Sequence, residues 1–405
     1  MINHADFYSN YLQHWDLDSS MTLLNHGAFG GTPRLVLARQ TQYRAQMEGQ
    51  ALRYYMREHE DLINESKQKV GDFLGMKPDN FVFVQNTTQG VNTILHSLRP
   101  EKGDEWLITS LNYGACVQTF KWYANKYGLT LNTAQIAFPL NHENEVVAGI
   151  IAALTPNTRL VLLDHITSAT GIVLPIQKII AQLRERNIDV LIDGAHAPGM
   201  LPLDIEGLGV TYYVGNCHKW ICSPKGSAIM YVRPDKQHEI APLQLSHFHD
   251  RAIGQLQHWS NQFVMTGTMD YSPYFCIATA IDFFEKTVEN GWNGVRAYNH
   301  NLALAARQLL AETLETPLPA PENMVGNLAN ILLHPDVAPP AYGYNYSEGL
   351  QDCLFHEYGI EVPIFYIKNK ETGKTAQYVR IACQLYNALP QYEYLAEALK
   401  KVLHK

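Results

Sequence analysis

Two strand-like runs in the middle of the chain end in residues that can take part in chemistry. Val190-Leu191-Ile192 leads into Asp193-Gly194-Ala195-His196, and the run from Val210 to Val214 leads into Gly215-Asn216-Cys217-His218-Lys219-Trp220. Short apolar runs are typical of buried parallel strands, and ligands of open α/β sheets lie beyond the carboxyl ends of such strands. We therefore expect the carboxylate of Asp193 and the amine of Lys219 to face one ligand.

A carboxylate and a lysine at such strand ends fit pyridoxal phosphate. Lys219 would bind this cofactor covalently through its amine, and Asp193 would keep the pyridine nitrogen protonated so that the ring can withdraw electrons. Taken alone, Asp193 could cap a turn and Lys219 could be a solvated side chain. Because both residues are present, the pair favours an enzyme over a protein that binds the cofactor without catalysis.

A second signal predicts where a phosphate would bind. The strand-like run Phe81-Val82-Phe83-Val84 is followed by Asn86-Thr87-Thr88-Gln89-Gly90 and a helical stretch over about 91–98. Free N–H groups at a helix N-terminus attract anions, and neighbouring hydroxyl groups add to this. The alternative is that Thr87 or Thr88 only caps the helix. The turn lacks the spaced glycines of a dinucleotide-binding fold, which disfavours that class of protein.

Two further strands place polar side chains at the same edge. Trp106-Leu107-Ile108-Thr109 leads to Tyr113, and the run from Leu160 to Asp164 leads to a turn that contains Ser168. Tyr113 could cover the face of a cofactor ring, or it could belong to the core. His247 and His249 alternate without a third ligand at a suitable spacing, so we expect no metal site.

Composition and charge narrow the classes of function. The chain has 405 residues, 46% hydrophobic and 17% charged, as expected for a globular protein of two domains. Its formal net charge of −8, without blocks of like charge, argues against nucleic acid or a membrane as the main partner. We expect no signal peptide and no membrane-spanning run. The six scattered cysteines show no metal spacing, which favours a cytoplasmic location.

The order of the predicted elements indicates an α/β fold with a mostly parallel sheet. Its strands lie near 81–84, 106–109, 160–164, 190–193, 210–214 and 226–232, and its helices near 33–74, 91–98 and 175–187. A smaller α+β unit has helices near 273–286, 295–314 and from 391 onwards, and strands near 329–333 and 378–381. We predict an N-terminal arm over 1–20, a large cofactor-binding domain over 21–272 and a small domain over 273–405.

With these residues in hand, the chain resembles the class V branch of fold-type I pyridoxal phosphate enzymes, and within it the isopenicillin N epimerase-like group. The resemblance extends from about Leu23 to the C-terminus. In many relatives a histidine covers the cofactor ring where this chain has Leu111, so the cover would be Tyr113 or Leu111 itself. The motifs that carry the resemblance are Leu24-Asn25-His26-Gly27-Ala28-Phe29-Gly30, Asp193-Gly194-Ala195-His196-Ala197-Pro198-Gly199, Asn216-Cys217-His218-Lys219-Trp220, Thr266-Gly267-Thr268-Met269-Asp270, and Val379-Arg380-Ile381-Ala382 followed by Tyr386-Asn387.

The resemblance implies roles for individual residues. Lys219 would hold the cofactor and act as the base at the α-carbon, Asp193 would pair with the pyridine nitrogen, and His196 and Ser168 would lie near the phenolic oxygen. The substrate α-carboxylate would be bound by the two-pronged guanidinium of Arg380, with Asn25 and Gly27 completing the pocket. In a homodimer the phosphate would be held by Thr87, Thr88, Asn216 and His218, and across the subunit interface by Gly267 and Thr268.

The resemblance favours epimerisation of an amino acid at its α-carbon. The residues themselves leave open a C–S lyase, desulfurase-like reaction and a class V aminotransferase reaction. Epimerisation needs an acid–base group on each face of the ring, and Tyr54, Tyr55 and Tyr113 are candidates for the group opposite Lys219. A desulfurase needs a mobile thiol shortly before the carboxylate-binding arginine, and residues 363–378 contain no cysteine.

Overall fold

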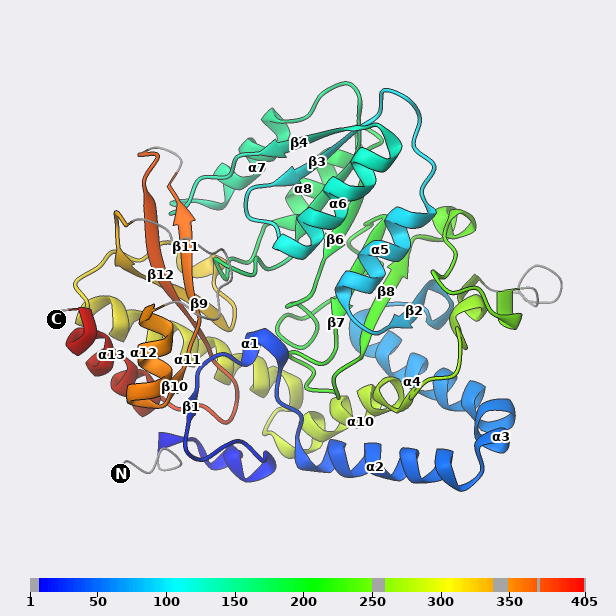
Figure 1. The fold of residues 1–405 in the computed structure, drawn as a ribbon, viewed down its shortest axis with the longest axis horizontal. Helices are drawn as coiled ribbons and strands as arrows, with labels where there is room; N and C mark the ends of the chain where they lie inside the picture. Colours follow the sequence, from blue (N-terminus) through cyan, green and yellow to red (C-terminus); the bar gives the residue numbers. More distant parts are fainter. Residues whose placement is uncertain (1–6, 250–258, 338–348, 370–371, 404–405) are drawn as a thin grey trace.

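A seven-stranded sheet forms the centre of the protein (Figure 1). We describe it from a computed structural model that covers residues 7–249, 259–337, 349–369 and 372–403. Across the sheet the strand order is β2-β8-β7-β6-β5-β3-β4, and only β8 runs against its neighbours. The strands are β2 (Phe81–Val84), β3 (Glu105–Thr109), β4 (Thr130–Ala134), β5 (Thr158–Asp164), β6 (Asp189–Asp193), β7 (Tyr212–Asn216) and β8 (Ala228–Val232).

Helices cover both faces of this sheet, which is why its inner strands are largely apolar, whereas the edge strand β4 is largely polar. Successive side chains of a strand point to opposite faces, so Val82 and Val84 pack toward one set of helices while Phe81 and Phe83 pack toward the other. The first set is α5 (Thr87–Ser97) and α6 (Gly114–Tyr127); the second is α4 (His59–Leu74), α7 (Glu143–Ala152), α8 (Ile176–Arg184) and α10 (Ser272–Thr287). The predicted α/β fold with a mostly parallel sheet is therefore confirmed.

A smaller antiparallel sheet packs beside the large one, on the left of Figure 1. Its order is β11-β12-β9, and its core joins Val379 and Ile381 of β12 to Leu395 of the last helix. This unit contains most of the predicted α+β part of the fold, but the helix predicted near 273–286 is α10, which packs against the large sheet. The domain boundaries remain predictions. Its elements are α11 (Gly291–Thr313), β9 (Leu328–His334), α12 (Gly349–Tyr358), β11 (Ile364–Lys368), β12 (Thr375–Ala382) and α13 (Leu389–Leu403).

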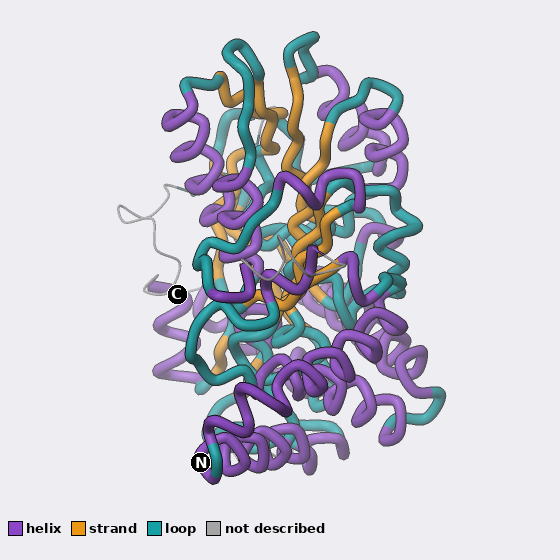
Figure 2. The backbone as a smooth tube through the Cα atoms, turned by 90° about the vertical axis from the view of Figure 1, so that its right-hand side faces the viewer, coloured by secondary structure: helices purple, strands orange, loops and turns teal. Residues whose placement is uncertain are grey.

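The N-terminal segment ties the two units together. After a short 3-10 helix η2 (Asn10–His14), β1 (Thr22–Leu23) pairs in parallel with β10 (Ile360–Glu361) of the smaller unit. The segment then forms α1 (His26–Phe29) against the large sheet, and Figure 2 shows the helices gathered around the strands from the side. Residues near position 25 are thereby held next to residues near position 380.

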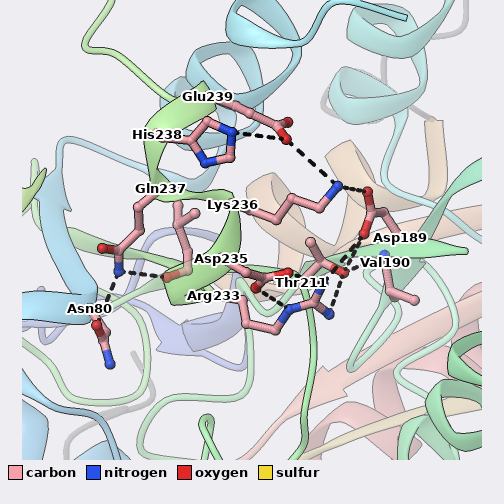
Figure 3. Close-up of polar contacts among 11 residues, drawn as sticks. Asn80, Asp189, Val190, Thr211, Arg233, Asp235, Lys236, Gln237, His238 and Glu239 are labelled. Carbon is pink, nitrogen blue, oxygen red and sulfur yellow. Dashed lines mark hydrogen bonds and ion pairs between the residues drawn. The ribbon is translucent and has the colours of Figure 1, made fainter. Parts of the chain in front are cut away.

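The amino ends of the strands are fixed by an ion-pair network (Figure 3). Asp189, the first residue of β6, accepts hydrogen bonds from the Lys236 amine at 2.8 Å and the Thr211 hydroxyl at 3.1 Å. Arg233, beyond β8, lies 3.8 Å from the same carboxylate and also pairs with Asp235. Every charge in this cluster has a partner of opposite sign close by.

Several predicted bounds were wrong, each for a local reason. The single helix predicted over 33–74 is divided in the structure into α2 (Arg34–Gly49), α3 (Ala51–Arg53), a π-helical turn at Tyr54–Glu58 and α4. The break between α2 and α3 arises because the backbone of Gln50 leaves the helical region. The strand predicted at 210–214 lies two residues later, since the Thr211 side chain bonds Asp189 and the Val190 N–H. The helix predicted from 91 begins at Thr87. Helices α6 and α7 and strands β4 and β11 were not predicted.

Within the residues that the structure describes, no helix is long and apolar enough to cross a membrane.

Candidate active site

Polar residues at or just beyond the carboxyl ends of five strands, β2, β3, β5, β6 and β7, line one cavity of about 310 Å³. Asp164 and Asp193 end the neighbouring strands β5 and β6 and lie directly opposite each other in the ladder. Asn216 ends β7, and the turns that follow bring further side chains to the same edge. The cavity is lined by Thr87, Thr88, Tyr113, Asp164, Ser168, Asp193, His196, Asn216, His218, Lys219 and Lys225, among others.

Lys219 lies in the turn after β7, with its amine at the cavity wall. Its Nζ atom is 3.2 Å from Nε2 of His196. Lys219 is partly buried, and this burial lowers its pKa to about 8 against the raising effect of Asp193. An amine with this pKa is partly unprotonated near neutral pH and can act as a nucleophile.

The N-terminal segment holds the Lys219 turn in place. His26 donates from Nε2 to the Lys219 carbonyl oxygen at 2.9 Å and accepts at Nδ1 from the Tyr386 hydroxyl at 2.8 Å. Gly30, with φ of 73°, passes so close that a Cβ atom there would lie 2.0 Å from the carbonyl oxygen of His218. Glycine is therefore required where the two segments cross.

Asp193 is 2% exposed and has only dipolar partners. It accepts hydrogen bonds from the Ala195 N–H at 3.0 Å and from the Cys116 thiol at 3.1 Å. Burial raises its pKa, because an ionised carboxyl group in these surroundings lacks a counter-ion at contact distance. A protonated pyridine nitrogen would supply that charge.

The start of α5 forms a cradle suited to a phosphate group. Thr87 and Thr88 occupy the first turn of this eleven-residue helix, and Asn86, not either threonine, caps it by accepting from the Gln89 N–H. The Thr87 N–H donates to the Asn216 side chain at 2.9 Å, while the buried Thr87 hydroxyl has no hydrogen-bond partner among the described residues. An unpartnered hydroxyl at a helix N-terminus fits an anion, so the residues present suit pyridoxal phosphate.

Arg380 lies beside the cavity on β12 and is 3% exposed. Its two terminal nitrogens donate to the carbonyl oxygen of Ser168 and, at 3.1 Å, to the side-chain oxygen of Asn25. Gly27 is next to His196, since a Cβ atom there would lie 3.5 Å from the imidazole. The structure thus brings together the three residues predicted to bind a carboxylate.

Other predicted residues lie outside the cavity. Gly267 and Thr268 are exposed and do not line it, so any contact with a cofactor phosphate would have to be with that of another subunit. Tyr54 is fully buried against Phe275, and Tyr55 donates to the Met269 carbonyl oxygen, so neither reaches the cavity. Of the three tyrosines proposed as the second acid–base group, only Tyr113 lines it.

Sequence reasoning missed three residues at the site. Asp164 is 2% exposed and accepts from the Asn112 amide at 2.7 Å and the Tyr113 N–H at 3.2 Å. Asp164 ends an apolar run, as Asp193 does, so the pattern that predicted Asp193 also applied to Asp164. Cys116 and Lys225 gave no such signal, because helix α6 was not predicted and Lys225 lies in a loop.

Comparisons with known proteins agree with this geometry. The sequence pattern of the family described as aminotransferase class-V matches residues 23–334. An isopenicillin N epimerase of Streptomyces clavuligerus is 30% identical, covering 95% of this chain and 95% of the relative. An L-cysteine desulfhydrase of Arabidopsis thaliana is 24% identical, covering 100% of this chain and 92% of the relative.

Solved structures show the same fold. A cystine C–S lyase in complex with its reaction product cysteine persulfide superimposes with a TM-score of 0.74 at 22% identity, covering 94% of this chain and 97% of that one. A variant of the same enzyme, with glycine covalently linked to its pyridoxal phosphate cofactor, matches with a TM-score of 0.73 at 21% identity, covering 94% of this chain and 96% of that one.

Proposed function

This chain belongs to the class V aminotransferase family of pyridoxal phosphate enzymes, and we propose that it epimerises an amino acid at its α-carbon. The observation that carries the proposal is the pairing of Lys219 and Tyr113 in one cavity. Lys219 comes from the turn after β7 and Tyr113 from the turn after β3, with β6 and β5 between them. Two acid–base groups on different walls can remove a proton on one side and return it on the other.

The proposed cofactor contacts follow the walls of the cavity. Lys219 would bind the cofactor covalently, Asp193 would face its pyridine nitrogen, and His196 and Ser168 would lie near its phenolic oxygen. When bound, pyridoxal phosphate makes the α-hydrogen of an attached amino acid acidic, because the negative charge left behind spreads over its ring. The phosphate would be held by Thr87, Thr88, Asn216 and His218.

Arg380 would orient the substrate. Its guanidinium presents two donors that now bond the Ser168 carbonyl oxygen and the Asn25 side chain, and a substrate carboxylate could take up both. Fixing the carboxylate sets which bond of the α-carbon stands perpendicular to the ring, and so places the α-hydrogen within reach of Lys219. The depressed pKa of Lys219, about 8, lets its amine take that proton near neutral pH.

The proposed unit is a homodimer. Gly267 and Thr268 are exposed on the loop before α10, where the phosphate site of a second subunit could receive them. Sedimentation of the cofactor-loaded protein tests this, and a monomer with full cofactor occupancy would exclude it.

A C–S lyase is the second candidate. Elimination of a β-substituent needs a base on one side of the ring only, which Lys219 alone supplies, and an L-cysteine desulfhydrase is among the full-length relatives. Five of the six cysteines are buried and Cys353 is partly buried, so the lyase would release sulfide or a persulfide directly rather than through an enzyme thiol. Transamination is the third outcome open to the family.

One experiment separates these outcomes. The holoenzyme is incubated in heavy water with single amino acids, cysteine and cystine, and the products are analysed by mass and by chiral chromatography. Epimerisation is expected to give both configurations with deuterium at the α-carbon. Pyruvate with sulfide or persulfide would instead identify a lyase, and a 2-oxo acid with aminated cofactor would identify an aminotransferase.

A further inference from the structure

His196 lies between an indole and an amine, and each of its ring nitrogens meets one of them. The indole Nε1–H of Trp220 donates to Nδ1 of His196 at 3.3 Å. On the other side of the ring, Nε2 of His196 is 3.2 Å from Nζ of Lys219. Trp220 is 1% exposed and His196 is 2% exposed, so the hydrogen bond between indole and imidazole is shielded from water.

These contacts determine where the imidazole proton lies. Burial is the largest cause that holds the pKa of His196 well below its ordinary value, so the ring is neutral and carries one proton. An indole nitrogen can only donate, which makes Nδ1 the acceptor. The proton must therefore be on Nε2, because the hydrogen bond at one ring nitrogen sets the state of the other.

The state of Nε2 acts in turn on Lys219. A protonated Nε2 points its hydrogen at Nζ, and only an unprotonated amine has a lone pair with which to accept it. An ammonium group at the same place would put two donors against each other. The contact thus favours the amine form, in agreement with a Lys219 pKa of about 8, for which burial is the largest cause.

We infer that Trp220 is a positioning residue that fixes the tautomer of His196 and thereby increases the share of the Lys219 amine that is unprotonated, the form that captures pyridoxal phosphate. The inference rests on the proposed role of Lys219 but not on which reaction the enzyme completes. Asp193 and Arg380 also influence Lys219, and Arg380, His26 and His218 also influence His196. None of them donates to Nδ1 of His196 in the part of the chain that the structure describes.

The first test is the tautomer itself. In the full chain labelled with ¹⁵N-histidine, the two ring nitrogens have distinct shifts, and the His196 signals are those lost in His196→Gln. The wild-type protein is expected to show protonated Nε2, and Trp220→Phe, which keeps an aromatic ring but removes the donor, is expected to lose that state. Trp292→Phe is the matched control, because its indole also donates in the core but to the Ile281 carbonyl oxygen.

The second test follows capture of pyridoxal phosphate by the cofactor-free chain as a function of pH, using visible absorbance and borohydride trapping. Removal of the donor should raise the pKa of Lys219, so the pH midpoint of capture in Trp220→Phe should rise by about one unit. At pH 7 this corresponds to capture that is roughly tenfold slower. Trp292→Phe should keep the wild-type midpoint.

A wild-type His196 protonated at Nδ1, or an unchanged tautomer and midpoint in Trp220→Phe, would overturn the inference. If Trp220→Phe does not fold, the wild-type spectrum still decides. Neither measurement uses an amino-acid substrate, so a different reaction class leaves the result intact. Capture by Lys219→Ala would instead refute the proposed role of Lys219.

Discussion

Strand β6 carries an aspartate at each end, and the surroundings of the two side chains contrast. Asp189, at the amino end, faces Lys236 and Arg233 and keeps 27% of its side chain exposed. Asp193, at the carboxyl end, is 2% exposed, and among the described residues no lysine or arginine lies within ion-pair distance of it. The contrast shows how a structural acid can be distinguished from a functional one. The structural acid has its counter-ions in the fold, and the functional acid would receive its counter-ion from a ligand.

The same difference extends along both edges of the sheet. At the amino edge the charges pair with one another, as Figure 3 shows for Asp189, Arg233, Asp235 and Lys236. At the carboxyl edge the Thr87 hydroxyl lacks a hydrogen-bond partner within the described part of the chain. Burial raises the pKa of Asp164 and Asp193 and lowers that of Lys219, which favours the neutral form of each. Unmet hydrogen-bonding capacity and perturbed pKa values at one edge are the marks of a site prepared for a ligand.

The largest effect is expected at Lys219. Replacing it with alanine removes both the covalent link and the proposed base, so α-proton exchange should fall by roughly a thousandfold or more. Lys225→Ala is the matched control, because Lys225 lines the same cavity but donates to the Gly30 carbonyl oxygen. Borohydride reduction and peptide mapping check the assignment, and a labelled Lys225 would contradict it.

At the carboxyl end of β6, Asp193→Asn keeps the shape and removes the charge. Turnover is expected to fall by roughly a hundredfold or more while the cofactor stays bound, because a buried carboxylate is the proposed partner of the pyridine nitrogen. Steady-state kinetics with cofactor content determined in parallel measures this. Near-normal turnover would mean that another group, of which Asp164 is the nearest candidate, fulfils the role.

Arg380→Lys should have an intermediate effect. The variant keeps the charge and loses the second donor, so kcat/KM for amino acids should fall roughly 10- to 100-fold. Amines without a carboxylate should react at nearly unchanged rates. An equal loss for both kinds of substrate would make Arg380 a structural residue, held between Ser168 and Asn25.

The smallest effects are expected on stability, and substitutions at the two ends of β6 should change the free energy of unfolding in opposite directions. Burial raises the pKa of Asp193, so the folded chain binds that proton more tightly than the unfolded chain. Without cofactor, stability should therefore decrease as pH rises above about 4, the ordinary carboxyl value, and through the raised pKa of Asp193. Asp193→Asn should flatten this dependence and raise the unfolding temperature at pH 7.

Asp189→Asn should instead lower stability by about 1 kcal/mol, because Lys236 and Arg233 lose their shared partner, and turnover should stay within about twofold. Thermal unfolding of both variants, without cofactor, from pH 4 to pH 8 makes the comparison. The contrast between the two edges would fail if both substitutions destabilised the protein equally at pH 7.

Local patterns predicted much of this site. The apolar run before Asp193 predicted the end of β6, and the run before Asn216 located β7 to within two residues. The order of strands and helices predicted their shared edge. Cys116 could not be predicted, because its contact with Asp193 joins residues 77 positions apart across a helix that the sequence did not reveal. The break at Gln50 was missed although Gly49 directly precedes it, because the helical pattern on both sides outweighed that single glycine.

The tie between the two ends of the chain has a consequence for biosynthesis. His26, which supports the Lys219 turn, accepts a hydrogen bond from Tyr386, 360 residues further along the chain. Asn25 accepts one from Arg380. On a ribosome, the large sheet can form while these partners have yet to be made, since chains fold from the N-terminal end as they emerge. The carboxylate pocket can then close only after Arg380 and Tyr386 have been made, about 150 residues after the last strand of the large sheet.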